Sequence, residues 1–402
     1  LPELTEGLVG VAFKDAAGQV VNRPNTILSQ QYFEDICYEE VKEIDLPYHR
    51  YWDKLRSKSA DTSLGGSRFV IENVRLYTTS HCPRGCGFCS SQAFVPEAQN
   101  KPSKIIMLSA EQVADLMVRY TKRFGARSFL FTDDDFPVGN KAGLDRMFEL
   151  CELIVAHKKS GLIHDQAIIA IQARIFDFII RGKNGVRTPN WPLMAAMAKA
   201  GFHSIGIGIE TFSDRLMKCL SVNKIGVNAD DCKMILDALI QSGLHPLTNL
   251  ILGIPESTVE ELVATMETAI DYIVRGTDMT ISPLMGAGPG SPMFAASQYN
   301  IRNKQWRHPA TGETIEIANY FVPDDPVIER MALAFEETSY DAGLQVDKNL
   351  PALKQIIEDK GWEGKFVHKK IVGLSALLTA ATLIGNEELS QRIRLTIEGT
   401  IS

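Results

Sequence analysis

The chain has 402 residues, of which 45% are hydrophobic and 23% are charged, a composition typical of a globular protein with a large core. A net charge of −7 disfavours a broad nucleic-acid-binding face, and no apolar run reaches the ~18 residues of a membrane span. The seven cysteines do not resemble a disulfide framework, so the expected compartment is the cytoplasm.

The first part of the chain predicts a hairpin and a linker. Residues 7–21 alternate apolar and polar side chains around a turn, which is typical of a β-hairpin. Because the chain opens on this hairpin without a Met, we expect residues 1–69 to be an extension at the tail of an upstream domain. We expect that domain to dock on exposed aromatic side chains of the linker, at Tyr48, Tyr51 and Trp52.

From residue 70 the pattern changes to alternating strands and helices, which predicts an α/β fold with parallel strands. Six strands are expected, at Val70–Tyr77, Arg127–Thr132, Ala167–Arg174, His203–Ile209, Pro246–Leu252 and Met279–Leu284. The intervening helices are expected at Ser109–Phe124, Lys141–Lys158, Trp191–Ala200, Ala229–Ser242 and Glu256–Arg275. Functional side chains of such folds gather where the strands end.

The alternation stops near residue 295. Residues 301–316 predict a loop with a short hairpin, and the remainder predicts helices. These helices are expected at Pro326–Asp341, Leu350–Lys360, Phe366–Ile384 and Glu387–Ile397. We therefore expect residues 296–402 to form a C-terminal, mainly helical domain.

Three cysteines lie in one short loop directly after the first of the six strands, at Cys82, Cys86 and Cys89. Pro83, Gly85 and Gly87 favour the tight turns that bring three thiolates to one metal centre. A 4Fe–4S cluster usually takes four cysteines, so three predict a cluster with one open iron. The alternative is a structural zinc site with His81 or a distant residue as the fourth ligand.

The spacing of these cysteines, with Phe88 before the last one, resembles the signature of the radical S-adenosylmethionine (SAM) superfamily. The resemblance implies that the open iron binds the amine and carboxylate of SAM, which is reductively cleaved to start radical chemistry. It also implies that residues 70–295 form a partial (β/α)6 TIM-like barrel, between the N-terminal extension and the C-terminal helices.

The resemblance implies five SAM contacts outside the cysteines. An aromatic residue shields the cluster (Phe88), and an acid ends the fourth strand after alternating glycines (Glu210). Polar residues on the third and fifth strands contact the SAM amine and ribose (Gln172 and Asn249). A basic residue pairs with the SAM carboxylate (Lys224). The structural alternatives are loop packing, strand-end capping, internal hydrogen bonding and, for Lys224, a solvated surface position.

Two further segments lie at strand ends. Asp133–Asp135 follow the second strand, where helix capping and a substrate or SAM role are both open. Gly286–Gly290 predict a flexible wall after the sixth strand. The other cysteines, Cys37, Cys151, Cys219 and Cys232, are scattered, and we expect Cys151 and Cys232 to be buried packing residues.

The hairpin, linker and Leu46–Pro47 step before the cysteines resemble the junction in cobalamin-binding radical SAM enzymes. This implies cobalamin as a further cofactor, with methyl transfer or ring remodelling on a small-molecule or natural-product substrate. It also implies an external electron donor such as flavodoxin or ferredoxin. The alternatives are a cobalamin-independent radical SAM enzyme, such as a methylthiotransferase-like enzyme, and a zinc-binding structural or interaction module.

Overall fold

A six-stranded parallel sheet organises the protein in this computed structural model. The structure describes residues 11–14, 17–24, 27–58, 72–91, 93, 95–96, 104–308, 311–335 and 362–401. The strands lie in the order β10-β9-β8-β5-β4-β3, and every neighbouring pair is parallel. Their bounds are β3 (Asn73–Leu76), β4 (Ser128–Phe131), β5 (Ile168–Ala173), β8 (Phe202–Glu210), β9 (His245–Gly253) and β10 (Asp278–Leu284).

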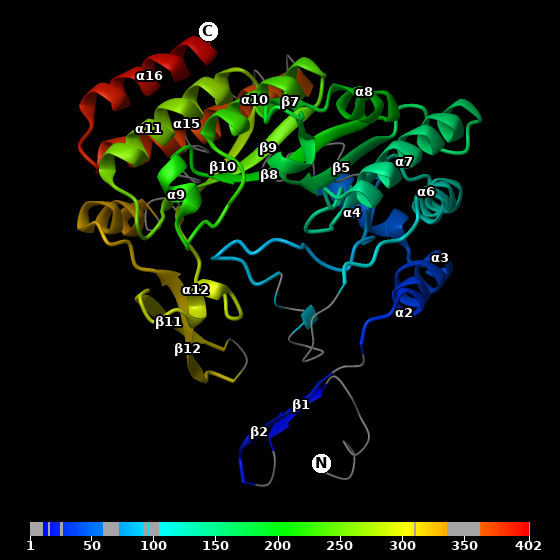
Figure 1. Cartoon of the computed structure of the whole chain (residues 1–402), viewed down its shortest axis with the longest axis horizontal. Coiled ribbons are helices and arrows are strands. Elements are labelled where there is room, and N and C mark those ends of the chain that lie inside the picture. Colours follow the sequence, from blue (N-terminus) through cyan, green and yellow to red (C-terminus); the bar gives the residue numbers. More distant parts are fainter. Residues whose placement is uncertain are drawn as a thin grey trace.

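Each strand lies beside the next one along the chain, so the sheet winds in one direction and its helices cover one face (Figure 1). These helices are α6 (Ala110–Phe124), α7 (Lys141–Lys159), α8 (Trp191–Ala200), α10 (Ala229–Gln241) and α11 (Val259–Val274). The expected α/β partial (β/α)6 barrel is therefore confirmed.

The helices begin where the sequence places capping side chains. The side chains of Ser109, Asn228 and Thr258 each accept a backbone N–H three residues on, which satisfies a donor that the helix leaves free. In each case the side chain of that third residue accepts a hydrogen bond from the backbone N–H of the cap, which completes a capping box. This local chemistry explains why α6, α10 and α11 start within a few residues of their expected positions.

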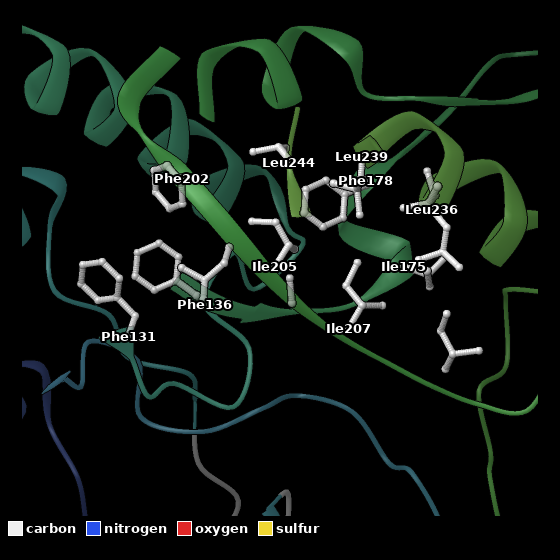
Figure 2. Close-up of a cluster of buried hydrophobic side chains, with 14 of the residues drawn as sticks. Phe131, Phe136, Ile175, Phe178, Phe202, Ile205, Ile207, Leu236, Leu239 and Leu244 are labelled. Carbon is white, nitrogen blue, oxygen red and sulfur yellow. The ribbon is translucent and has the colours of Figure 1, made fainter. Parts of the chain in front are cut away.

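The core fills the space between the sheet and its helices. Phe131, Phe136 and Phe178 are fully buried there. Figure 2 shows these rings beside aliphatic side chains of β8 and α10, which include Ile205, Ile207, Leu236 and Leu239. The opposite face of the sheet is more polar, and on β5 the exposed Gln172 lies between buried neighbours. One face of the sheet therefore packs, and the other is open for binding.

The N-terminal extension is more helical than expected. Strands β1 (Val11–Lys14) and β2 (Val20–Arg23) form the expected antiparallel hairpin. The segment expected to be a linker instead forms short helices, at α2 (Gln30–Glu34), a π-helix (Asp35–Glu40), α3 (Val41–Glu43) and α4 (Tyr48–Lys58). These helices lie beside α6 in Figure 1.

The expectation of exposed linker aromatics is wrong for two of the three residues. Trp52 is 2% exposed, and its indole N–H donates to the Asn73 carbonyl at 3.3 Å. The Tyr48 ring packs on Phe124 of α6 with centroids 5.1 Å apart. Only Tyr51 is exposed, at 59%. The amphipathic α4 therefore packs Tyr48 and Trp52 against the barrel and leaves Tyr51 exposed, so the three aromatic side chains do not form one exposed surface.

Several short elements were not expected from the sequence. A 3-10 turn (Ile175–Phe178) follows β5 and leads into an antiparallel hairpin of β6 (Ile179–Arg181) and β7 (Arg187–Pro189). The short helices α9 (Asp214–Lys218) and α12 (Pro292–Ala295) follow β8 and β10. They are too short for a clear periodic pattern, and they surround the ends of the strands.

The C-terminal part begins with the expected hairpin, formed by β11 (Ile301–Arg307) and β12 (Thr314–Phe321). Residues 326–335 are helical, whereas the helix expected at Leu350–Lys360 lies outside the described residues. Helices α15 (Trp362–Leu383) and α16 (Glu387–Ile401) pack beside α11 and share its apolar core. None of the helices in the described ranges is long and apolar enough to cross a membrane.

Candidate cofactor site

The open face of the sheet brings polar residues of three strands together near their carboxyl ends. In the parallel register Gln172 of β5 lies beside Gly206 of β8, and Gly208 lies beside Asn249 of β9. Paired residues of neighbouring strands point to the same face, so Gln172 and Asn249 both point to the open side. The two glycines between them leave space that side chains would otherwise fill.

The cysteine loop runs from β3 across these strand ends and is fixed by three distant contacts. The Phe88 N–H donates to the Ser221 carbonyl at 3.1 Å, and the Met293 N–H donates to the Gly87 carbonyl at 2.9 Å. The Asn223 amide donates to the Gly85 carbonyl. A Cβ at Gly87 would lie 1.7 Å from the Leu220 carbonyl oxygen, so this close approach requires glycine.

The three thiols of the loop are electrostatic neighbours. Burial raises the pKa of Cys82 to about 12, and repulsion from the Cys86 thiolate adds to this effect. Burial also raises the pKa of Cys86, and the Cys89 thiolate contributes. Such thiols are unfavourable as bare thiolates, and binding to iron would supply the compensating positive charge. The donor set therefore fits a cluster held by three cysteines.

The zinc alternative would need ligands that converge on one ion. Among the described residues, no three His, Cys, Asp or Glu side chains converge closely enough to hold a single metal ion. The neighbouring His81 ring instead contacts the Ser80 hydroxyl at 2.9 Å. A cluster spreads its thiolates over separate iron atoms, so it accepts a wider arrangement than one zinc ion does.

Glu210 and Lys224 form a buried ion pair at the end of β8. The Lys224 ammonium lies 2.5 Å from Glu210 Oε2 and also donates to the Gly208 carbonyl. The backbone of Glu210 is left-handed, with φ 64°, which is uncommon for a non-glycine residue. A Cβ at Gly208 would lie 2.6 Å from Glu210 Oε1. Lys224 is therefore not the solvated surface lysine considered above.

Gln172 and Asn249 differ in how far their own neighbours satisfy them. The Gln172 side chain is exposed on the open face and packs against Gly206, where a Cβ would lie 2.3 Å from Gln172 Oε1. The Asn249 amide oxygen accepts a hydrogen bond from the Ser282 hydroxyl at 3.1 Å. Within the described part of the chain, no hydrogen bond uses the Asn249 amide N–H groups or either end of the Gln172 amide, so these groups are open to a ligand.

Phe88 is partly buried and packs against an apolar cluster at the end of the barrel. This cluster includes Leu216, Val222, Ile251, Met285 and Met293. The packing expected as the alternative for Phe88 is therefore present. Phe88 also lies between two candidate cluster ligands of one loop, Cys86 and Cys89, in the sequence.

The three acids after β4 have separate roles in the structure. Asp133 Oδ1 accepts backbone N–H groups of Thr78 and Thr79, which lead into the cysteine loop. Burial raises the Asp133 pKa against the opposing effect of these hydrogen bonds. Asp134 accepts from the Ser91 hydroxyl, and Asp135 pairs with Arg174 at 2.7 Å. All three contact protein groups, but the expected helix capping is not among these contacts, since the cap of α7 is Asn140.

The sequence interpretation missed three residues that the structure places here: Asn223, Arg174 and Asp177. Asn223 holds the cysteine loop, as described above. Arg174 lies two residues after Gln172, and Asp177 lies in the following turn, 2.6 Å from the Arg174 guanidinium. The available signal was a charged residue directly after a buried strand, at the position where binding groups gather. As expected, Cys151 and Cys232 are buried.

Residues 76–269 match the family model described as the Radical SAM superfamily. The match begins at the end of β3, spans the cysteine loop and extends into α11, so it contains every candidate SAM contact named above. It covers just under half of the chain. Similarity to this family implies a 4Fe–4S cluster and SAM as cofactors.

One curated relative is the uncharacterized methyltransferase PH0819 of Pyrococcus horikoshii, which is 22% identical over 321 residues. The match covers 79% of this chain and 59% of the relative. The structure of the cobalamin-dependent SAM radical enzyme OxsB matches with a TM-score of 0.62 and 15% identity. This match covers 100% of this chain and 57% of the OxsB chain.

The radical SAM methyltransferase TsrM of Kitasatospora setae, solved with cobalamin and a 4Fe–4S cluster, matches with a TM-score of 0.50 and 13% identity. The match covers 80% of this chain and 60% of the TsrM chain. At these identities the structural matches establish the fold alone. The chain thus spans less than two thirds of each of these three relatives.

Proposed function

We propose that Cys82, Cys86 and Cys89 hold the 4Fe–4S cluster of this radical SAM enzyme, and that SAM binds at the adjoining strand ends. The observation that carries this proposal is one loop with three closely spaced cysteines, fixed over the open face of the barrel by hydrogen bonds to Ser221, Asn223 and Met293. When bound, the cluster supplies the electron that cleaves SAM.

The surrounding residues fit the polar parts of SAM. The Glu210 carboxylate accepts hydrogen bonds from ribose hydroxyls or from the SAM ammonium group. Lys224 orients this carboxylate through the ion pair, and it offers further donors to the SAM carboxylate. The amides of Gln172 and Asn249 face the same space and bind the amine and ribose. Phe88 shields the site from water.

Iron analysis after anaerobic reconstitution tests the cluster ligands. Changing Cys82, Cys86 and Cys89 together to Ala should remove the bound iron and the visible absorbance, because clusters of this type depend on thiolates. The matched control changes the four other cysteines, Cys37, Cys151, Cys219 and Cys232, and should keep nearly all of the iron. Full iron content in the first variant, or one zinc per chain in the unchanged protein, would contradict the assignment.

We further propose cobalamin-dependent methyl transfer as the reaction, with ring remodelling as the second candidate. Support comes from the relatives, because one is named a methyltransferase and two solved neighbours are cobalamin-dependent or cobalamin-bound. The substrate is a small molecule or natural product, and an external low-potential protein such as flavodoxin or ferredoxin supplies the electron.

The reaction is tested with the full-length gene product, SAM, a reductant and candidate substrates. Methyl transfer should add 14 mass units to the product and should stop when cobalamin is omitted, whereas ring remodelling adds no methyl group. Full turnover without cobalamin would instead support a cobalamin-independent radical SAM enzyme.

A further inference from the structure

A buried arginine lies beside the cysteine loop with part of its guanidinium unused by the protein. Arg174 Nη2 donates to the Val138 carbonyl at 3.0 Å and pairs with Asp135 at 2.7 Å and Asp177 at 2.6 Å. Its Nε and Nη1 atoms are buried and make no hydrogen bond to any residue that the structure describes. Unpaired buried donors are costly, so they indicate a missing partner.

The turn that follows Arg174 packs against the cysteine loop. The Arg84 guanidinium, between Cys82 and Cys86 in the sequence, stacks over the Phe176 ring at 4.7 Å. Phe176 lies two residues after Arg174, in the same turn as Asp177. The arginine and its acids therefore lie close enough to the cysteine loop to change the energy of any charge placed there.

The chain around Arg174 is shaped to hold the guanidinium in place. Val138 and Gly139, in the loop after β4, have φ angles of 62° and 61°, and this backbone is unfavourable for a β-branched residue. A Cβ at Gly139 would lie 2.1 Å from Asp177 Oδ1 and 2.6 Å from Arg174 Nη2. This loop conformation brings the Val138 carbonyl to Arg174 Nη2, so local strain accompanies the fixed arginine.

The two acids hold the Arg174 guanidinium in place without supplying two full negative charges against its one positive charge. Asp177 is buried, and its pKa is raised well above its usual range by burial and by the neighbouring Asp135 carboxylate. Asp177 also accepts the backbone N–H of Arg174 at 2.7 Å. The pair therefore orients the guanidinium through Nη2 while Nε and Nη1 stay available.

We propose that Arg174 is a positioning residue that directs Nε and Nη1 to the sulfur atoms of the bound cluster and raises its reduction potential. This inference rests on the proposed function, because it requires the cluster at Cys82, Cys86 and Cys89. Reduction by an external one-electron donor adds one negative charge to a cluster that three thiolates already make anionic. A fixed cation nearby stabilises that added charge.

Redox titration of the reconstituted full chain tests this role, with dithionite and low-potential dyes and with the reduced cluster measured by electron paramagnetic resonance. Arg174→Gln should bind as much iron as the unchanged protein, and its midpoint potential without SAM should be more negative. Arg174→Lys keeps the charge but not the fork of donors, so it should restore part of the shift.

Two further variants separate charge from general disturbance. Changing Asp135 and Asp177 together to Asn removes negative charge beside Cys82, so it should shift the potential in the positive direction. Arg181→Gln is the matched control, because Arg181 stacks on Phe176 at 4.9 Å in the adjoining hairpin and makes its polar contact with Gly226. Its potential should not change.

Each result decides the inference. Full iron with an unchanged potential in Arg174→Gln would overturn it and leave the cluster assignment intact. Weakened SAM binding with an unchanged potential would also overturn it and assign Arg174 to SAM. Shifts of the same sign in the arginine and double-aspartate variants would indicate a structural disturbance and also overturn it. Failure of the unchanged protein to bind iron would instead contradict the proposed function.

Discussion

The buried pair of Glu210 and Lys224 shows how single residues combine at the end of β8. Each charge would be costly alone, because burial removes its water, but the two neutralise each other at 2.5 Å. Gly208 makes the pairing possible, since its missing side chain leaves room for both groups. The pair is thus a fixed polar group at the mouth of an apolar barrel.

Replacing Glu210 by Ala should weaken SAM binding by about 1–3 kcal/mol, the usual cost of losing hydrogen bonds to a charged group. It should also lower the melting temperature, because Lys224 is left buried without its carboxylate. Isothermal titration with SAM on the reconstituted variant measures the first effect, and iron content checks that the cluster is retained. Unchanged SAM affinity would assign Glu210 to strand-end capping.

The sequence predicts a residue well when its role follows from a short local pattern. The three cysteines and the strand-end positions of Gln172 and Glu210 follow from motif spacing and from the strand–helix alternation. Arg174 was missed because its partners, Asp135 and Asp177, lie in loops whose backbone conformation has no periodic signature. The left-handed Val138 is a feature that only tertiary contacts impose.

At the scale of elements, helix α15 is joined to the barrel by charge as well as by apolar contact. The Lys369 ammonium bonds to Asp278 at the start of β10, and the Lys370 ammonium donates to the Val274 carbonyl of α11 at 2.8 Å. His245 lies 3.7 Å from the same Asp278 carboxylate. Asp278 thus links β9, β10 and α15.

The Asp278 link should weaken in acid. Burial alone would raise the Asp278 pKa, but the hydrogen bond from Lys369 and the nearby His245 ring outweigh burial and lower it. The stabilisation is therefore present above the unfolded pKa of about 4 and is lost as pH falls through the lower folded value. Asp278→Asn should cost about 1–2 kcal/mol of unfolding free energy at pH 7. The difference in unfolding free energy between Asp278→Asn and the unchanged protein should disappear in strong acid.

Urea unfolding at pH 7 and in acid measures this difference. Asp271→Asn is the control, because Asp271 is 62% exposed and pairs with Arg392 at the surface. Exposed pairs contribute little, so the control should differ from the unchanged protein by less than about 1 kcal/mol at any pH. An equal loss in both variants would argue against a special role for Asp278.

The long helices and strands were predictable because each carries many repeats of its apolar period and a capping residue at its start. α8 has the expected bounds, and α6 begins one residue after its predicted cap. The helical segments of residues 30–43 were missed because each is short, and one is a π-helix without a regular apolar pattern. The longer α4 was missed although it is amphipathic. Its aromatic residue Tyr48 packs against α6 rather than following a local rule.

On the scale of the whole molecule, the C-terminal helices pack against the last part of the barrel, where α15 contacts β10 and α11. Buried side chains of α15 and α16, which include Leu374, Leu377, Leu389 and Ile393, belong to the same apolar core as the sheet. Gly373 allows the close crossing, since a Cβ there would lie 3.1 Å from Ile273 of α11. The C-terminal helices therefore share one apolar core with the barrel.

Ending the chain after residue 335 should expose this core and lower the melting temperature strongly. The loss of four buried leucine or isoleucine side chains alone corresponds to about 6–12 kcal/mol of apolar burial. Circular dichroism melting and binding of a fluorescent apolar dye measure the effect. A truncated chain that melts like the full one would show that residues 362–401 are an independent attachment.

The contacts of the cysteine loop also order events in time. Residues 85–88 bond to Ser221, Asn223 and Met293, which are synthesised long after the cysteines. Contacts between such distant positions form slowly, because the intervening chain must first lose its freedom. The three cysteines are therefore synthesised before the residues that hold their loop in place. We expect a folded, iron-free barrel to be the form that receives the cluster, so iron delivery follows translation.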